Sequence, residues 1–307
     1  MSANLVGSER APARDRAAAA TLTEERRAAL FHEQRSLLFG LAYRMLGSAA
    51  DAEDMLQDAY LRWQQTSIES IVSPRAFLVT VVSRLCINLL QSARVRRETY
   101  TGQWLPEPLA TPVEATDTSD ESLSMAFLLM LQRLSTPERI VFLLREVLDY
   151  PHAEIARIIG ESEVYCRQIL RRARQHVSRA RARFAPTHTL HAKVLAQFQT
   201  VVAGGELQPL LALLAEDAVL YSDGGGKGPA LPVPIVGAAK VARGILGAQR
   251  KLVPKTLTTK LMRVNGQPAL VSFLKARTYS VLLLDLADGR IRNIYIISNP
   301  DKLTHVA

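Results

Sequence analysis

The sequence predicts a multi-domain protein in which two all-α domains precede an α+β domain. Three observations lead to this fold class. The chain has 307 residues, more than one typical domain needs. Apolar residues recur at helical spacing as far as about residue 184. Beyond Pro186, two helical patterns are followed by a run of β-like segments, which is the order of elements in an α+β domain.

The first helical domain is expected over residues 24–98, after a disordered leader at residues 1–23 that is rich in alanine and arginine. Gly47 is typical of a helix end and Ser48 of the cap of the next helix. Proline is tolerated in the first turn of a helix, so Pro74 opens a third one. The helices of this domain are predicted at 24–46, at 51–65 and from Pro74 to about Arg94.

A linker and a second helical domain come next in the chain. The apolar periodicity vanishes over residues 99–120, where three prolines and scattered acids are typical of a linker. Helical spacing returns in the second domain, residues 121–185. Within it, a short helix at 151–159, a turn at Gly160 and a long basic helix capped by Ser162 predict a helix-turn-helix.

The last domain, residues 186–307, mixes helices with strands. A loop rich in glycine and proline at 223–234 separates the first strand from the third helix of this domain. Helices are predicted at about 189–203, 206–215 and 238–248, and strands at 218–221, 256–264, 268–274, 278–286 and 290–298.

The charge favours a polyanionic partner. The net charge is +9 and the isoelectric point is near 9.8, which points first to nucleic acid and second to an anionic membrane surface. Residues 1–185 carry only +2 (24 basic and 22 acidic), whereas residues 186–307 carry +7 (14 basic and 7 acidic). Any DNA affinity of the helical domains must therefore come from local arginine clusters.

Several other classes are disfavoured. No apolar run approaches the roughly 18 residues of a membrane span. Two cysteines, Cys86 and Cys166, make neither a disulfide framework nor a zinc pattern. The histidines and acids of residues 186–307 form no convincing acid–base pair. We therefore expect no catalytic residue, no metal and no cofactor, and a cytoplasmic location as the default.

The basic helix of the helix-turn-helix presents a polar outer face. Cys166, Ile169 and Leu170 are expected to point inward. Arginine and glutamine can each reach two atoms of a base edge in the major groove, and arginine also neutralises phosphate. The other interpretation of this segment is a solvated basic helix in an ordinary bundle. The outward residues are Arg167, Gln168, Arg171 and Arg172.

Three segments in this order resemble the extracytoplasmic-function family of bacterial RNA polymerase sigma factors. Residues 51–63, DAEDMLQDAYLRW, resemble the region 2 signature that docks on RNA polymerase, and residues 74–88 resemble the helices that open and read the −10 element. The helix-turn-helix matches region 4, which reads the −35 element. The resemblance implies polymerase contacts by Asp51, Asp54, Gln57 and Asp58, −10 contacts by Arg84, Asn88, Gln91 and Arg94, and −35 contacts by Arg167, Gln168, Arg171 and Arg172.

Three further motifs resemble the SigJ-like group of that family, whose extension is a SnoaL-like cone domain. They are WLPEP at 104–108, DGGGK at 223–227 and NPDKL at 299–303. Consecutive glycines expose N–H groups, so Lys227 beside them would hold an anion, and Asp301 would pair with Lys302 or cap a turn. Turn chemistry that merely shapes the domain is the alternative. The regulatory contacts predicted here are Trp104, Pro106, Glu107, Asp223, Gly224, Gly225, Gly226, Lys227, Asn299, Pro300, Asp301 and Lys302.

The resemblance implies a transcription initiation factor with core RNA polymerase and promoter DNA as partners. The extension would pack on region 2 and the linker and regulate in cis, with no separate anti-sigma factor required and no membrane partner. Its excess positive charge would either contact DNA or polymerase, or neutralise the acidic linker and the acidic turn of region 2. Neutralisation fits regulation in cis best. The alternative is a polymerase-independent DNA-binding regulator whose C-terminal domain senses a small ligand or is a vestigial enzyme. The acids after Asp51 and the second reader at Asn88 argue against that alternative.

Overall fold

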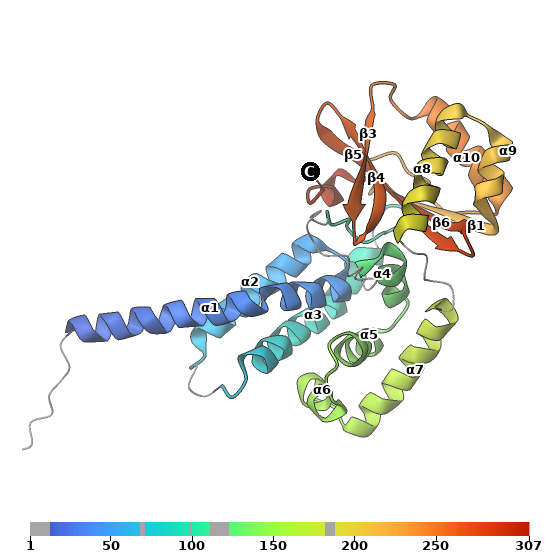
Figure 1. Cartoon of the computed structure of the whole chain (residues 1–307). Coiled ribbons are helices and arrows are strands. Elements are labelled where there is room, and N and C mark those ends of the chain that lie inside the picture. Colours follow the sequence, from blue (N-terminus) through green and yellow to red (C-terminus); the bar gives the residue numbers. More distant parts are fainter. Residues whose placement is uncertain (1–12, 68–70, 99, 111–122, 182–187, 307) are drawn as a thin grey trace, which may run out of the picture.

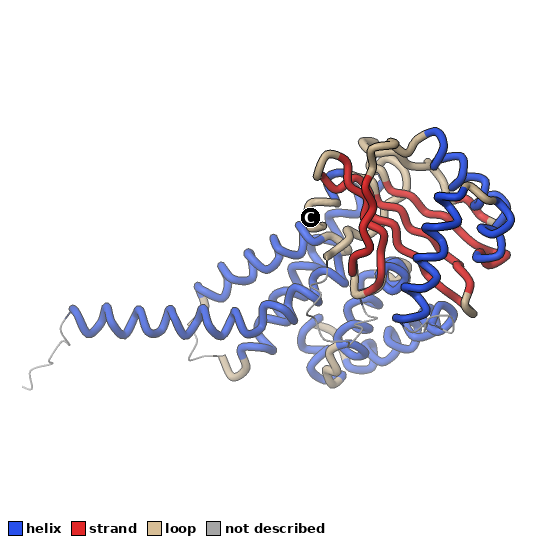
Figure 2. The backbone as a smooth tube through the Cα atoms, turned by 45° about the horizontal axis from the view of Figure 1, so that its top comes forward, coloured by secondary structure: helices blue, strands red, loops and turns tan. Residues whose placement is uncertain are grey.

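A computed structural model describes residues 13–67, 71–98, 100–110, 123–181 and 188–306. Helices fill the N-terminal half, and a sheet with its own helices forms the C-terminal domain, as predicted (Figures 1 and 2). The part of the predicted linker at 111–120 lies outside the described residues.

Three helices make the first domain: α1 (Ala13–Leu46), α2 (Ala49–Gln65) and α3 (Pro74–Glu98). The start of α1 differs from the prediction, because the leader expected to be disordered over 1–23 is helical from Ala13 onward. An alanine run with high helix propensity at 17–20 is consistent with that early start. Ser48 caps α2 as predicted, since its Oγ accepts a hydrogen bond from the Asp51 N–H at 3.1 Å.

The second domain contains α4 (Met125–Gln132), α5 (Thr136–Phe142), a π-helical turn at Leu143–Val147, α6 (His152–Ile159) and α7 (Glu163–Arg181). Gly160 ends α6 in the left-handed conformation, at φ 75°, where glycine has no steric penalty. The turn after Gly160 leads directly into α7. The helix-turn-helix predicted from this spacing is therefore present.

The first two domains share one apolar core. It extends from Phe31 of α1 and Trp63 of α2 to Val177 of α7. The buried guanidinium of Arg139 in α5 donates to the carbonyls of Leu131 and of Met45 at the end of α1. The two helical domains are thus packed directly against each other.

The C-terminal domain is a six-stranded mixed sheet in the order β2-β1-β6-β5-β4-β3. All neighbouring strands are antiparallel except β1 and β6, which are parallel with Leu220 opposite Ile294. The two-residue edge strand β2 was not predicted. The elements are α8 (His188–Gly204), α9 (Leu207–Leu213), β1 (Leu214–Asp223), β2 (Ile235–Val236), α10 (Ala238–Lys251), β3 (Thr258–Val264), β4 (Gln267–Leu274), β5 (Arg277–Ala287), β6 (Arg290–Ile297) and a final 3₁₀ turn, Pro300–Lys302.

The two faces of the sheet bury different partners. One face packs against α8, α9 and α10 around Phe198 and Leu210 (Figure 1). The opposite face packs against Leu105 of the linker, Met125 of α4 and the end of the chain at Val306. The C-terminal domain therefore contacts the linker and the second helical domain through the sheet face that its own helices leave uncovered. This is the α+β architecture predicted for the extension.

Candidate functional site

The outer face of α7 carries the predicted −35 readers. Cys166, Ile169 and Leu170 are buried, which fixes the rotation of the helix. The Oγ of Ser162 accepts from the Tyr165 N–H at 3.2 Å and so caps the first turn. All four side chains predicted to point outward are exposed: Arg167, Gln168, Arg171 and Arg172.

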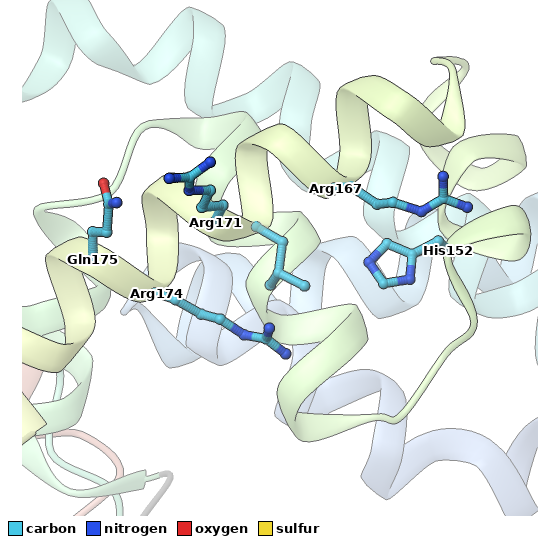
Figure 3. Close-up of a pocket in the computed structure, with 6 residues that line it drawn as sticks. His152, Arg167, Arg171, Arg174 and Gln175 are labelled. Atoms are coloured by element: carbon cyan, nitrogen blue, oxygen red, sulfur yellow. The ribbon is translucent and has the colours of Figure 1, made fainter.

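A hollow of about 460 Å³ opens between the start of α6 and α7. His152, Arg167 and Arg171 line it, together with Leu170, Arg174 and Gln175 (Figure 3). Burial, reinforced by the charges of Arg145 and Arg167, lowers the pKa of His152, so the neutral imidazole is favoured. Three arginines thus line the hollow.

The arginines around the hollow differ in how they are engaged. Arg167 pairs with Glu163 at 2.6 Å and Arg174 with Glu146 at 2.7 Å. Within the described part of the chain, Arg171 and Arg172 make neither an ion pair nor a hydrogen bond. A DNA phosphate or base edge would therefore meet Arg171 and Arg172 without displacing an acid.

The predicted −10 readers lie along α3, and they are not equivalent. Asn88 and Gln91 are exposed on the same side of the helix. The Nε of Arg84 instead donates to the carbonyl of Ile158 at 3.1 Å, and its Nη2 to that of Arg157 at 3.4 Å. Those carbonyls belong to the last turn of α6, the end of a helix that favours cations. The side chain of Arg94 lies outside the described residues.

The predicted polymerase-binding residues occupy the first half of α2. Asp54, Gln57 and Asp58 are exposed and follow the i, i+3, i+4 spacing of one helix face. Asp51 is half-buried at the start of the helix, where a negative charge is favourable. The fourth acid of the turn, Glu53, pairs with Arg35 at 2.6 Å.

Glu107 of the linker caps the same helix from outside. Its Oε2 accepts from the N–H groups of Ala49 at 2.7 Å and Ala50 at 3.3 Å, and its Oε1 from the hydroxyl of Ser48 at 2.9 Å. The carboxylate is buried and lies at the positive end of α2. The linker thus supplies part of the N-terminal cap of α2, the helix that carries the predicted polymerase-binding residues.

A second linker contact is centred on Asp223, whose carboxylate is fully buried at the end of β1. Its Oδ2 accepts from the Leu105 N–H and from the Lys302 ammonium, both at 2.8 Å. Its Oδ1 accepts from the Tyr100 hydroxyl at 2.6 Å and from the Gly225 N–H at 3.1 Å. Burial, and then the hydrogen bond to Asp223 and the charge of that carboxylate, raise the pKa of Tyr100.

Lys302 also contacts the linker directly. Its ammonium also donates to the Leu105 carbonyl at 2.6 Å and lies 4.0 Å from the ring centroid of Trp104 and 4.9 Å from that of Tyr100. The amide of Asn299 donates to the Tyr100 hydroxyl at 2.9 Å. We call Tyr100, Trp104, Asp223, Asn299 and Lys302 the linker-binding cluster.

Some predicted pairings of these motifs are wrong. Asp301 pairs with Lys227 at 2.5 Å, not with Lys302. Lys227 is therefore engaged by an acid of its own domain. We also expected basic residues of the extension to neutralise the acidic turn of α2 and the linker. Among the described residues, no ion pair joins the extension to those acids. There, Glu53 pairs with Arg35, and Glu107 is satisfied by a hydroxyl and by N–H groups.

Sequence reasoning missed Tyr43 and Asn265. The amide of Asn265, in the turn between β3 and β4, donates to the Tyr43 hydroxyl at 2.6 Å, and that hydroxyl donates to the carbonyl of Glu107. Asn265 also accepts from the Leu109 N–H at 3.0 Å. Burial raises the pKa of Tyr43, so it remains a neutral donor. A lone polar residue in an apolar helical stripe was the only signal that could have marked Tyr43.

The described residues lack two features that would indicate other classes of protein. They contain no helix long and apolar enough to cross a membrane. They also contain no group of three or more histidine, cysteine or acidic side chains suited to a metal ion.

Comparison with known proteins bears directly on these surfaces. The family described as Sigma-70 region 2 matches residues 30–96, which comprise the second half of α1, all of α2 and most of α3. The family described as Sigma-70, region 4, matches residues 124–183, which contain α4 to α7.

Full-length relatives cover the C-terminal domain as well. The chain is 36% identical over 288 residues to the ECF RNA polymerase sigma factor SigJ of Mycobacterium tuberculosis, spanning 89% of this chain and 92% of SigJ. It is 32% identical over 286 residues to the probable ECF RNA polymerase sigma factor SigI of the same species, spanning 90% of this chain and 94% of SigI. The crystal structure of M. tuberculosis SigJ superposes with a TM-score of 0.73 at 33% identity, covering 92% of this chain and 98% of that one. Sigma factors of this kind bind RNA polymerase for promoter recognition, and the chain belongs to their extracytoplasmic-function (ECF) family.

Proposed function

We propose that this sigma factor reads promoter DNA through the exposed faces of α3 and α7 and is regulated in cis by its C-terminal domain. Core RNA polymerase would bind the acidic face of α2. The C-terminal domain would control how far the two helical domains can separate, so that no separate anti-sigma factor is required.

The −35 contacts proposed for α7 rest on its unpaired side chains. Arg171 and Arg172 have no acidic partner among the described residues, and Gln168 is exposed beside them. Arg167 would contribute once its pairing with Glu163 gives way to a phosphate. On α3, Asn88 and Gln91 would meet unstacked bases of the −10 element.

The polymerase contact proposed for α2 rests on charge and exposure. Asp54, Gln57 and Asp58 share one exposed face, and Asp51 continues it to the start of the helix. Complementary charge on a partner would steer the encounter and fix the register. The cap that Glu107 supplies would keep this face ordered.

The closed packing of the two helical domains motivates the regulatory part of the proposal. The −10 and −35 elements lie about 25 base pairs apart, or roughly 85 Å along straight duplex DNA. In the closed arrangement Arg84 of α3 instead touches the last turn of α6 directly. The protein would therefore have to open before it reads both elements at once.

The single observation that carries cis-regulation is the enclosure of the linker by the C-terminal domain. Leu105 is held through both its N–H and its carbonyl, by Asp223 and Lys302, which are buried. Trp104 lies between Lys302 and Gly47 at the end of α1. A linker held in this way cannot extend, and its release would allow opening.

The test is run-off transcription with core polymerase, comparing the full chain with a chain that ends at Pro186. The proposal expects promoter activity to change on deletion, and unchanged run-off transcription would contradict it. Lys302→Met in the full chain should change activity in the same direction, because it loosens the linker. Lys227→Met is the matched control, since its ion pair with Asp301 is exposed and does not touch the linker.

The same assay addresses the alternative of a polymerase-independent regulator. Family membership argues for polymerase as the partner. A chain that binds promoter DNA but supports no transcription with core polymerase would favour the alternative instead.

A further inference from the structure

A long stretch of the C-terminal domain contains no acidic residue. Between Asp223 and Asp285 the chain has ten lysines and arginines and not one aspartate or glutamate. This segment therefore carries +10, more than the net +7 of residues 186–307, because all seven acids of that region lie outside it. The linker-binding cluster uses none of these ten cations, because Lys302 lies outside the segment.

The structure gathers half of these cations on α10 and the turn after it. Val241, Ala242, Ile245 and Leu246 are buried against the sheet and so define the inner face of α10. At 100° per residue the opposite face is centred near Gly247. The cations on and just after this outer face are all exposed, and we call them the α10 basic face: Lys240, Arg243, Arg250, Lys251 and Lys255.

No acid in the described part of the chain pairs with the α10 basic face. None of its five cations lies within ion-pair distance of a carboxylate. Acids do occur on the neighbouring elements. Asp217 on β1 pairs with Arg292, whereas Glu206 at the start of α9 is exposed and makes no ion pair with α10. Five like charges left unpaired on a small surface repel one another, and a polyanion would relieve that repulsion.

The composition of the α10 basic face favours nucleic acid over a protein partner. Protein interfaces are usually centred on large aromatic or apolar side chains. Between the cations of α10 itself lie Gly244, Gly247 and Ala248 instead, and Leu252, just after the helix, is the one large exposed apolar side chain among the described residues 238–255. A methyl group at position 247 would meet no atom within 4 Å, although glycine costs a helix interior about 1 kcal/mol relative to alanine. The outer face of α10 therefore combines cations with small residues, and a phosphate backbone can approach it closely.

We infer that the α10 basic face binds the phosphate backbone of double-stranded DNA without reading its sequence. Lys240 and Arg250 are ten residues apart, or about 15 Å along the helix axis, which matches about four base-pair steps. The face lies on the side of the sheet opposite the linker-binding cluster. Closing on the linker and binding DNA would therefore use different surfaces of one domain. The inference goes beyond the proposed function, because neither α3 nor α7 takes part.

The test measures the salt dependence of binding to duplex DNA that contains no promoter element. Full-length wild type would be compared with Arg243→Gln/Arg250→Gln/Lys251→Gln, using a fluorescent mixed-sequence duplex of about 40 base pairs. The matched control is Lys260→Gln/Lys275→Gln/Arg277→Gln, which removes three exposed cations of the same acid-free segment that lie outside α10. Because both variants lose the same net charge, long-range attraction is lowered equally.

Each neutralised phosphate contact contributes a slope of about −0.9 to log K against log salt. Loss of three contacts makes the slope shallower by about 2.7. Between about 50 and 200 mM salt, the affinity of wild type should then fall about 40-fold further than that of the α10 variant. The control variant should follow wild type.

Two outcomes would overturn the inference. In the first, the α10 variant and the control have the same slope, which would leave only a general effect of charge. In the second, the α10 variant keeps wild-type duplex binding but loses affinity for core polymerase, which would make the face a protein contact. The promoter contacts proposed for α7 are tested separately with Arg171→Ala, which leaves the α10 basic face unchanged, whereas the α10 variant leaves α7 unchanged.

Discussion

Replacing Lys302 by methionine tests the linker-binding cluster most directly. Methionine keeps an unbranched apolar side chain but removes the ammonium that lies between Asp223, the Leu105 carbonyl and the Trp104 ring. Lys302 is 5% exposed and Asp223 is fully buried, so water cannot replace the lost charge. Removal of one partner of a buried ion pair costs about 3–5 kcal/mol, because the other charge is left uncompensated.

We expect a loss of free energy near the middle of that range, because Asp223 keeps its other hydrogen bonds. Its carboxylate keeps the Leu105 N–H, the Tyr100 hydroxyl and the Gly225 N–H as donors. A loss of about 4 kcal/mol corresponds to roughly a thousandfold shift of a two-state equilibrium. The equilibrium between the closed and released states of the linker should shift toward release by that factor.

Amide hydrogen exchange in the full chain measures the shift. The Leu105 N–H, which donates to Asp223, should exchange roughly a thousandfold faster in Lys302→Met, while amides of α7 keep their wild-type rates. Lys227→Met should change little, because exposed ion pairs contribute about 0–1 kcal/mol. Adding Asp223→Asn to Lys302→Met should recover part of the loss, since the uncompensated charge is then removed. A Leu105 rate within about threefold of wild type in Lys302→Met would refute the reasoning.

Three further predictions concern other parts of the chain. Burial raises the pKa of Asp285 to about 6, so the unfolded state ionises first. The unfolding free energy should therefore fall as pH rises from about 4 to 6, by up to about 3 kcal/mol. Urea titrations should show Asp285→Asn equal to wild type near pH 4 and more stable above pH 6, and a gap that does not vary with pH would contradict this. Arg171→Ala should weaken promoter binding and make the salt slope shallower by about 1, measured by anisotropy, whereas an unchanged slope would remove Arg171 from the interface. Glu107→Ala should leave two N–H groups of α2 without an acceptor at a cost of about 1–3 kcal/mol, seen as faster exchange of Ala49 and Ala50, and unchanged rates would show that the cap is dispensable.

Much of the helical architecture could be predicted because its signals are local. Gly160 ends α6 in the left-handed conformation, and Ser162, two residues later, caps α7. The burial of Cys166 follows from helical spacing within α7. The start of α1 was placed too late, because an alanine run carries no apolar stripe to mark a helix. The high helix propensity of alanine is consistent with a helix that starts at Ala13.

The partners inside the C-terminal motifs could not be predicted from sequence. Asp223 meets Lys302 across 79 positions and Leu105 across 118, and no periodicity links residues so far apart. Asp301 and Lys302 are neighbours in sequence, yet Asp301 pairs with Lys227 and Lys302 pairs with Asp223. The turn after Pro300 sends Lys302 into the buried cluster and leaves Asp301 at the surface with Lys227. Only the fold of the sheet decides which of the two is buried.

The buried contacts that hold the helical domains and the linker together also separate two responses to ionic strength. Arg139 joins α5 to the end of α1 through carbonyl oxygens, and the ion pair of Lys302 with Asp223 is shielded from solvent. At 0.1 M salt, mobile ions screen the interaction between exposed charges that lie more than about 10 Å apart. Buried ion pairs are screened much less. Raising the salt concentration should therefore release the protein from DNA while leaving its closed conformation intact. A salt titration can thus report on DNA affinity alone, and a change of pH or a substitution is needed to move the conformational equilibrium.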